Sequence, residues 1–192
     1  MPETLPPTAV VIGCSAGGVH ALGTVLSELA RDIACPVIVV CHTGSEDVEM
    51  LREVLSFKSA IPVQEAVERH WPQAGIAYLA PAGYHLIIER DGDFALSVDD
   101  RVCYCRPSID VLFESAAAAH GARLIGVVLT GANDDGANGL RHIRAHQGLA
   151  IVQSPDEALA ATMPAAAIRV AGADHIVLLA DVAPLLNRLC CP

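Results

Sequence analysis

Apolar residues along this chain fall into two alternating patterns. Short continuous apolar runs rich in β-branched residues are typical of strands buried on both faces of a parallel sheet, whereas apolar residues three or four positions apart are typical of helices. The runs that predict strands cover residues 8–12, 36–41, 123–129, 149–152 and 175–179, with 61–66 as a weaker candidate. The segments that predict helices cover residues 19–30, 46–57, 107 or 108 to 120, 137–146 and 182–189, with short helical regions after Pro155 and after Pro164. The alternation predicts an α/β fold, a doubly wound, mostly parallel sheet with helices on both faces.

The middle of the chain follows a different pattern. Residues 75–80 predict a strand that ends at Pro81, and residues 84–90 and 93–98 predict a short antiparallel hairpin with Asp91-Gly92 as its turn. We expect this middle part to be antiparallel. Just before it, Ser45 is expected to cap the helix of residues 46–57.

Composition limits the class of protein. The chain has 192 residues, of which 53% are hydrophobic, and it contains no linker or repeat, so residues 1–192 are expected to form a single domain. No apolar run is long enough to span a bilayer and the N-terminus lacks a signal peptide, so we expect a cytoplasmic protein without direct membrane insertion. The net charge of −10 argues against nucleic acid as a partner.

The seven cysteines form no disulfide framework and no C-x-x-C pair. We interpret them as reduced thiols, mostly buried small apolar residues. Cys14 lies beside Ser15, but the G-x-S-x-G motif does not have its nucleophile at that position.

The first predicted strand runs into a candidate nucleophile, Ser15. Gly13-x-Ser15-x-Gly17 fits the sharp strand-to-helix turn that exposes a serine hydroxyl, with unpaired N–H groups of the following helix behind it. The same pattern also suits a phosphate-binding turn or tight packing. The dinucleotide fingerprint G-x-G-x-x-G fails, because Ser15 stands at its middle glycine, and the chain has no Walker lysine.

Two further strands end in polar side chains, His42 and the pair Asp134-Asp135. The carboxyl ends of parallel strands meet at one edge of the sheet, so Ser15, His42 and an aspartate can converge there as nucleophile, general base and orienting acid. Taken singly, the histidine also suits a solvated or capping role, and Asp-Asp-Gly suits a turn and helix cap. The order Ser…His…Asp differs from that of α/β-hydrolases.

Six segments of the sequence, in order, resemble the chemotaxis protein-glutamate methylesterase family, that is, the CheB-type catalytic domain. They are V-I-G-C-S-A-G-G (11–18), V-V-C-H (39–42), Y-L-A-P-A-G-Y-H-L (78–86), R-P-S-I-D-V-L-F-E-S-A-A (106–117), L-T-G-A-N-D-D-G-A-N-G-L (129–140) and M-P-A-A-A-I (163–168). The resemblance implies that Ser15 is the nucleophile, His42 the base and Asp135 the acid, with Asp134 left as a loop or capping residue. It implies an α/β fold of the kind predicted above.

The resemblance also implies an activity: hydrolysis of methyl esters on glutamate side chains in the cytoplasmic helices of methyl-accepting receptors, and deamidation of glutamine. The reaction needs no metal and no organic cofactor. Backbone N–H groups at Ala16, and near Ala132, would hold the oxyanion. The chain departs from the family at Ala132-Asn133, where Met-Gly is usual, and at Thr43-Gly44, where Met-Pro is usual.

Family members usually carry an N-terminal receiver domain, whereas only a few residues precede the first predicted strand here. We therefore expect a stand-alone enzyme, favoured by Met1, or an excised catalytic domain, with no receiver domain. Two other functions stay open besides the nucleotide-binding module that the glycine pattern disfavours. One is a serine esterase acting on a different substrate, and the other is a catalytically silent binding module of a sensory pathway.

The remaining polar residues have structural interpretations. Ser108 is expected to be an N-cap, and packing or capping explains His85 and Arg106 at least as well as a functional role. His142 and His146 have the spacing of a metal-binding pair on a helix, but a solvated polar face is the better interpretation without a third ligand.

Overall fold

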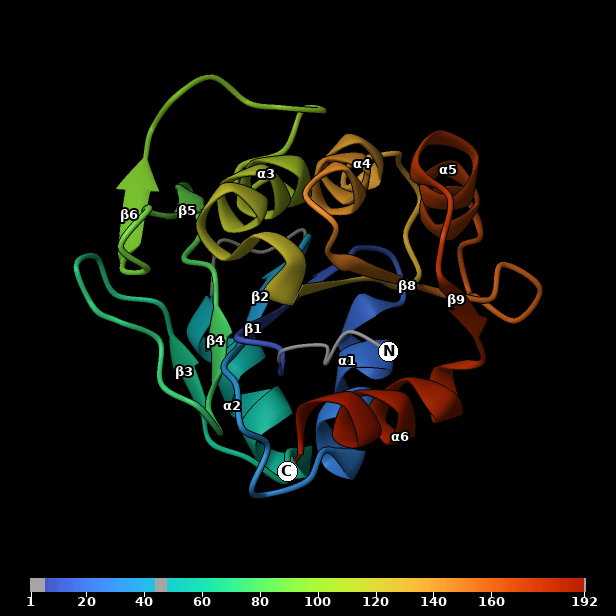
Figure 1. Ribbon diagram of the computed structural model, residues 1–192, viewed down its shortest axis with the longest axis horizontal. Coiled ribbons are helices and arrows are strands. Elements are labelled where there is room, and N and C mark those ends of the chain that lie inside the picture. Colours follow the sequence, from blue (N-terminus) through green and yellow to red (C-terminus); the bar gives the residue numbers. More distant parts are fainter. Residues whose placement is uncertain (1–5, 44–47, 192) are drawn as a thin grey trace.

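A seven-stranded parallel sheet forms the centre of the protein. The computed structural model describes residues 6–43 and 48–191, and its main sheet has the strand order β3-β4-β2-β1-β7-β8-β9 (Figure 1). The strands are β1 (Ala9–Cys14), β2 (Val37–Cys41), β3 (Val63–Glu65), β4 (Ala77–Leu79), β7 (Leu124–Val128), β8 (Leu149–Gln153) and β9 (His175–Val177). Strands β2, β4 and β3 lie on one side of β1 and strands β7, β8 and β9 on the other, so the strand order reverses between β1 and β7. The predicted doubly wound α/β fold is confirmed.

Helices cover both faces of this sheet. In Figure 1, α3, α4 and α5 lie on one side of it and α1, α2 and α6 on the other. The helices are α1 (Gly18–Glu28), α2 (Val48–Lys58), α3 (Ile109–His120), the single 3-10 turn η1 (Gly121–Arg123), α4 (Ala137–Ala145), α5 (Thr162–Ala171) and α6 (Leu179–Cys190). None of the helices within residues 6–43 and 48–191 has the length and apolar character that crossing a bilayer requires.

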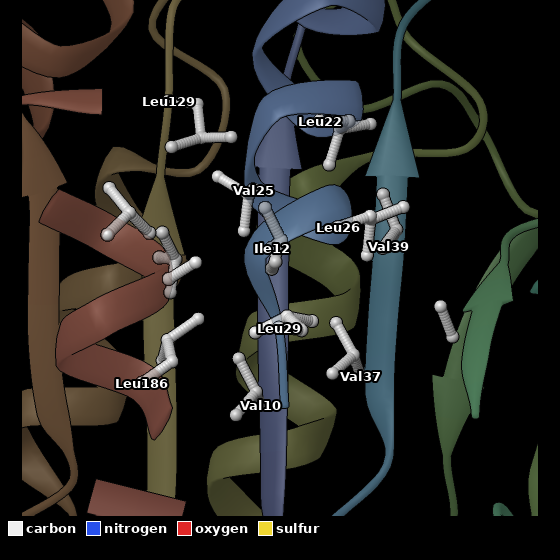
Figure 2. Close-up of a cluster of buried hydrophobic side chains, with 14 of the residues drawn as sticks. Val10, Ile12, Leu22, Val25, Leu26, Leu29, Val37, Val39, Leu129 and Leu186 are labelled. Atoms are coloured by element: carbon white, nitrogen blue, oxygen red, sulfur yellow. The ribbon is translucent and has the colours of Figure 1, made fainter. Parts of the chain in front are cut away.

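The central strand β1 explains why the runs of apolar residues are continuous. All six of its residues are buried, because alternate side chains enter the cores on opposite faces of the sheet. Figure 2 shows one of these cores, in which Val10 and Ile12 lie against side chains of α1 such as Leu26. On the other face, Val11 belongs to a core shared with Phe113 of α3. Burying each large aliphatic side chain contributes about 1.5–3 kcal/mol, so the two cores fix the strand ends that follow.

The predicted hairpin is confirmed. Strands β5 (His85–Ile88) and β6 (Phe94–Ser97) pair antiparallel in a separate two-stranded sheet. Gly92 has a φ of 97° in the connecting turn, a conformation that suits glycine. The hairpin packs beside α3, and the ring of Phe94 meets that of Tyr78 edge-on, with centroids 5.2 Å apart.

The prediction that the whole middle part is antiparallel is wrong for β4. This strand joins the main sheet and pairs in parallel with both β2 and β3. All three of its residues are buried, as in the other central strands. A three-residue strand is too short to show this by its pattern, since its apolar run fits either orientation.

The predicted short helix after Pro155 is also wrong. The chain there makes only a turn, in which Ser154 O accepts hydrogen bonds from the N–H groups of Glu157 and Ala158. The next helix, α5, begins at Thr162 rather than after Pro164, and the proline lies within its first turn, where a missing N–H costs no helical hydrogen bond. The predicted cap at Ser45 lies outside the described residues.

The substitution Gly13→Ala tests how tightly the end of β1 is packed. A Cβ atom on Gly13 would lie 2.3 Å from Cγ2 of the buried Ile109, so we expect Gly13→Ala to lower the free energy of unfolding by about 1–3 kcal/mol through overpacking. Urea denaturation measures the change. Gly23→Ala is the matched control, because a Cβ there meets only Lys58 Cδ at 3.4 Å, and alanine in a helix is favoured by about 0.5–1 kcal/mol. Equal stability of Gly13→Ala and the wild type would contradict this packing.

Candidate active site

The carboxyl ends of three neighbouring strands bring the predicted triad residues to one edge of the sheet. Ser15 follows β1 directly and His42 follows β2, and these strands pair so that Cys14 lies opposite Cys41. Two backbone hydrogen bonds continue the pairing past the strand ends, from His42 N to Cys14 O (2.9 Å) and from Ser15 N to Thr130 O (2.9 Å). The nucleophile and base candidates therefore start from adjacent positions.

The chain turns sharply after Ser15 to start α1. Gly17 has a left-handed φ of 79°, and Gly18 N donates a 2.7 Å hydrogen bond to Ser15 O. A Cβ on Gly17 would also lie 2.8 Å from the side chain of Leu159. The predicted strand–turn–helix setting of the G-x-S-x-G motif is therefore present.

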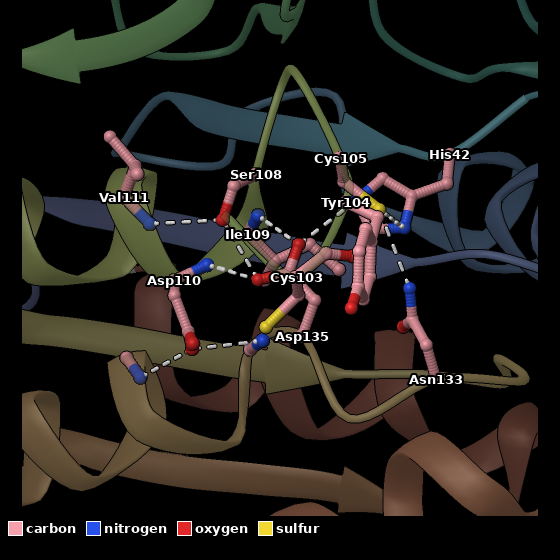
Figure 3. A network of polar contacts seen from close by, with 12 residues as sticks. His42, Cys103, Tyr104, Cys105, Ser108, Ile109, Asp110, Val111, Asn133 and Asp135 are labelled. Atoms are coloured by element: carbon pink, nitrogen blue, oxygen red, sulfur yellow. Dashed lines mark hydrogen bonds and ion pairs between the residues drawn. The ribbon is translucent and has the colours of Figure 1, made fainter. Parts of the chain in front are cut away.

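His42 and Asp135 contact each other. Nε2 of His42 lies 3.0 Å from Oδ2 of Asp135, whose side chain is fully buried, while the histidine side chain is 12% exposed (Figure 3). The N–H direction is bent away from the oxygen, so this contact is an ion pair when His42 is protonated rather than a directed hydrogen bond. The structure thus brings together two of the three residues proposed from the sequence.

The start of α3 holds the Asp135 carboxylate. Its Oδ1 accepts hydrogen bonds from Ser108 Oγ (2.8 Å) and Asp110 N (3.0 Å), and its Oδ2 accepts one from Ile109 N (2.7 Å). Burial by itself would raise the pKa of Asp135, but His42 and these donors at the helix N-terminus outweigh it, so the pKa lies below its ordinary value. Asp135 is therefore ionised at neutral pH.

A second buried carboxylate, Asp110, holds the loop that carries Asp135. Its Oδ1 accepts hydrogen bonds from Gly136 N (2.9 Å) and Gly139 N (2.6 Å) at the start of α4. Burial raises the pKa of Asp110 despite these donors. The segments R-P-S-I-D and D-D-G-A-N-G thus fix each other, with α3 holding Asp135 and Asp110 holding the first turn of α4.

Ser15 and His42 are adjacent but not hydrogen bonded: within the described residues, the Ser15 hydroxyl has no hydrogen bond to the imidazole. Instead, Nδ1 of His42 lies 3.6 Å from Sγ of Cys105, to which Asn133 Nδ2 donates a 3.5 Å hydrogen bond (Figure 3). Sequence reasoning missed Cys105, Asn133 and Asp110 as neighbours of the site. Only Asp110 left a signal, a carboxylate in the first turn of a helix with a mainly apolar face.

The predicted oxyanion positions, Ala16 and Ala132, are both exposed beside Ser15 and Asn133. Their backbone N–H groups donate to no acceptor in the described part of the chain. The Thr130 hydroxyl fixes the loop that carries Ala16, because it donates to Ala16 O (2.9 Å) and accepts from Ala160 N (2.9 Å). Beside Ala132, Gly131 N donates to Ala160 O (3.0 Å) and Gly131 O accepts from Met163 N (2.9 Å). Two fixed, unpaired donors thus lie at this edge of the sheet.

A pocket of about 330 Å³ opens beside His42. It lies between the end of β2, the end of β4 and the segment before α3, and its lining includes His42, Tyr104, Cys105 and Arg106. Arg106 donates hydrogen bonds to the carbonyl oxygens of Val98 (2.7 Å) and Asp99 (3.0 Å), which holds this segment in place. Small molecules and ions can therefore reach His42 and Cys105 from solvent.

The structural interpretation of His85 is confirmed. Its side chain is buried, with Nδ1 accepting from Ser108 N (3.2 Å) and Nε2 3.1 Å from Asp100 O, so it orders the approach to α3. Ser108 is the N-cap of α3, as predicted. His142 lies 3.6 Å from Glu114, and among the described residues no third ligand joins His142 and His146.

The cysteines are all free thiols, as expected, but fewer are buried than predicted. Cys14, Cys35 and Cys190 are buried, whereas Cys41, Cys103, Cys105 and Cys191 are partly accessible. Burial raises the pKa of Cys14 well above its ordinary value, which suits a packing role beside Ser15 rather than a reactive one.

Comparison with known proteins places this arrangement among related chains. A family model described as CheB methylesterase matches residues 10–186. A protein of Leptospira interrogans, provisionally named a protein-glutamate methylesterase/protein-glutamine glutaminase, is 44% identical over 182 residues, 94% of each chain. A protein-glutamate methylesterase/protein-glutamine glutaminase of Symbiobacterium thermophilum is 33% identical over 97% of this chain and 51% of its own length. The crystal structure of the Thermotoga maritima CheB methylesterase catalytic domain superposes with a TM-score of 0.91 at 27% identity, covering 96% of this chain and 100% of that domain.

The buried Asp135 carboxylate predicts a pH-dependent contribution to stability. Asp135→Asn offers only one acceptor oxygen to the three donors of α3, so at pH 7 we expect it to lower the free energy of unfolding by about 1–3 kcal/mol. The pKa of Asp135 is depressed in the folded protein, so its stabilisation is present above the unfolded pKa of about 3.9 and is lost as pH falls through the folded pKa. The difference between variant and wild type should therefore shrink below about pH 4.

Urea denaturation at a series of pH values measures this difference. Asp134→Asn is the matched control, because residue 134 is exposed and, among residues 6–43 and 48–191, its backbone oxygen but not its carboxylate accepts a hydrogen bond, from Ala137 N. It should change stability by less than about 0.5 kcal/mol. A loss in Asp135→Asn that stays constant down to acid pH would contradict the ionised state.

Proposed function

This chain belongs to the CheB methylesterase family, and from that premise we propose that it is a serine hydrolase that removes methyl esters from glutamate side chains of methyl-accepting receptor proteins. The observation that carries the proposal is the contact between His42 and the buried, ionised Asp135, beside the strand end that carries Ser15. The receptor's cytoplasmic helices would supply the substrate. The enzyme would then act in the cytoplasm.

The first step is attack by Ser15 Oγ on the ester carbonyl carbon. Since Nε2 of His42 faces Asp135, Nδ1 is the nitrogen left to take the serine proton. The protonated imidazole then gives this proton to the departing methoxide, which leaves as methanol, and the glutamyl group stays on Ser15 as an acyl-enzyme. Water, deprotonated by His42, hydrolyses the acyl-enzyme to the free glutamate and restores Ser15.

Asp135 serves the imidazole rather than the substrate. Its negative charge stabilises His42 in the protonated form that arises in each step, and the donors of α3 keep the carboxylate fixed and ionised. When His42 takes up a proton, its contact with Asp135 becomes an ion pair inside the protein. The pair requires little movement, because its partners are already 3.0 Å apart.

The oxyanion would form between the unpaired N–H groups of Ala16 and Ala132. Neither group has another acceptor among residues 6–43 and 48–191, and the Thr130 hydroxyl fixes the loop carbonyl of Ala16. A donor of this type is worth about 3–4 kcal/mol in the transition state of acyl transfer. Attack on a γ-amide would use the same groups and release ammonia, which extends the proposal to glutamine deamidation.

The missing Ser15–His42 hydrogen bond bears on the alternatives. Such bonds are often long or badly aligned in free enzymes and shorten when the substrate is bound. A permanently silent binding module would have no need for a buried carboxylate held ionised beside a largely buried histidine, since burying that charge is costly. The pair therefore favours hydrolysis, either of receptor esters or of a different ester.

Methanol release from methylated receptor-containing membranes tests the proposal. We expect release by the wild type, a fall in kcat of about 10⁶ in Ser15→Ala and in His42→Ala, and a fall of about 10⁴ when Asp135 is removed. Asp134→Asn, one residue from the acid and exposed, should retain wild-type release. If methanol release is lost in Asp134→Asn but not in Asp135→Asn, the acid is Asp134 and the assignment of Asp135 is wrong.

A fluorophosphonate probe separates the alternatives on the same samples. Labelling that is absent in Ser15→Ala, without methanol release by the wild type, would show an esterase with another substrate. The absence of both labelling and release would show a binding module and overturn the proposal.

A further inference from the structure

The side of His42 that faces away from Asp135 meets a thiol, and the three residues together make a set of metal ligands. His42, Cys105 and Asp135 each offer one ligand atom, and these atoms all lie within 4.8 Å of one another. They come from three separate segments: the end of β2, the segment before α3 and the loop after β7 (Figure 3). We propose that His42, Cys105 and Asp135 bind a divalent transition-metal ion, Zn²⁺ in the first place, and that the bound ion inhibits the enzyme.

The donor chemistry selects this class of ion. Thiolate sulfur, imidazole nitrogen and carboxylate oxygen are the three ligand types of zinc sites, with bond lengths of about 2.3, 2.0 and 2.0–2.2 Å. Two ligands at these bond lengths around a tetrahedral ion lie roughly 3.3–3.6 Å apart. One ion binds only one ring nitrogen of His42, and that nitrogen, Cys105 Sγ and an Asp135 carboxylate oxygen all lie within 4.8 Å of one another, so small side-chain movements bring them to this spacing. Mg²⁺ and Ca²⁺, which require several oxygen ligands, find only one carboxylate here.

The total charge of the three ligands also matches that of a divalent ion. A thiolate and a carboxylate with a neutral imidazole carry two negative charges, which a divalent ion neutralises. Burial and the Asp135 charge raise the pKa of Cys105, so the free site holds a protonated thiol. Binding therefore displaces that proton: the S–H bond breaks, an S–metal bond forms and one H⁺ is released to solvent. The hydrogen bond from Asn133 and the positive charge of Arg101 favour the thiolate form that binds.

The site is accessible from solvent, and two of its buried polar atoms have no hydrogen-bond partner among the described residues. Cys105 and His42 line the pocket of about 330 Å³, so an ion can enter from solvent. Among the described residues, Nε2 of His42 and Oδ1 of Asn133 are buried without a hydrogen-bond partner, which leaves the site under-satisfied when it is empty. The fourth position around the ion would be open to water.

A second cluster, of Cys103, Asp110 and Asp135, suits a metal less well. Asp110, which stands in this cluster where the first has His42, already accepts backbone N–H groups from Gly136 and Gly139, and no imidazole takes part. Burial and nearby carboxylates raise the pKa of Cys103 to about 11. Cys103 therefore provides the matched control for Cys105, two residues away.

Inhibition follows from the chemistry of His42. A nitrogen lone pair that binds a metal cannot accept the Ser15 proton, and the positive ion beside Asp135 removes its stabilisation of the imidazolium. This consequence rests on the proposed function, but metal binding itself does not. The two are therefore measured separately.

Cobalt(II) is the probe for binding, because a thiolate ligand gives it a sulfur-to-metal charge-transfer absorption in the near ultraviolet. We expect the 192-residue protein to develop this absorption with one equivalent of Co²⁺ and to lose it on adding Zn²⁺. Cys103→Ser should behave as the wild type. Cys105→Ser should lose the absorption, and His42→Ala should bind at least about 100-fold more weakly, since even an outer partner of a ligand is worth 10–100-fold.

Circular dichroism and urea denaturation check that Cys105→Ser and a second variant, Cys105→Ala, are folded. No charge-transfer absorption in the wild type, or the same absorption in folded Cys105 variants, would overturn the site. In the esterase assay, Zn²⁺ should inhibit the wild type and Cys103→Ser but not Cys105→Ser, while Mg²⁺ should inhibit none of them. Inhibition of Cys105→Ser equal to that of the wild type would overturn the inhibitory role. If the wild type hydrolyses no ester, only the proposed function fails, because the cobalt titration still decides the binding.

Discussion

The interaction on which this site depends is the capture of the Asp135 carboxylate by the N-terminus of α3. An ionised carboxylate in a fully buried position is stable only if donors replace the water it has lost. Ser108 Oγ and the first backbone N–H groups of the helix supply them, at 2.7–3.0 Å. The desolvation cost of this buried charge is thus offset by backbone N–H groups that the first turn of a helix leaves without intrahelical partners.

The same contact ties three segments that are far apart in the sequence. Ile109 donates to Asp135 through its backbone, and its side chain fills the space that Cβ atoms on Gly13 and Gly136 would occupy. Asp110, the next residue, holds Gly136 and Gly139. The turn that carries Ser15, the start of α3 and the loop that carries Asp135 therefore form one packed unit. A change in any of them is expected to reach the other two.

Much of the fold, and the edge of the sheet where the site lies, could be predicted from the sequence. Continuous apolar runs gave the buried strands, and parallel strands place their carboxyl ends together, which brought His42 and Asp135 to one edge. Two features of the fold, and two neighbours of the site, could not be predicted. The orientation of the three-residue strand β4 depends on its partners rather than on its own pattern. The turn after Pro155 is held by Glu157, whose carboxylate accepts hydrogen bonds from Gln153 Nε2 and Leu179 N. The neighbours Cys105 and Asn133 reach His42 through tertiary packing alone, and no spacing in the sequence records that approach.

His42 lies between the Asp135 carboxylate and the Cys105 thiol, and the carboxylate charge helps to keep the thiol protonated. Burial and the negative charge of Asp135 keep Cys105 protonated, so in the free protein the thiol does not compete with the carboxylate for the imidazole proton. A thiolate at that position would add a second negative charge beside the imidazole and hold its proton back from the leaving group. The arrangement that suits ester hydrolysis is therefore the one in which the thiol is neutral. A bound divalent ion favours the thiolate instead, because it stabilises the thiolate and the carboxylate together and binds the imidazole nitrogen. The same three residues therefore support either ester hydrolysis or metal binding, but not both at once.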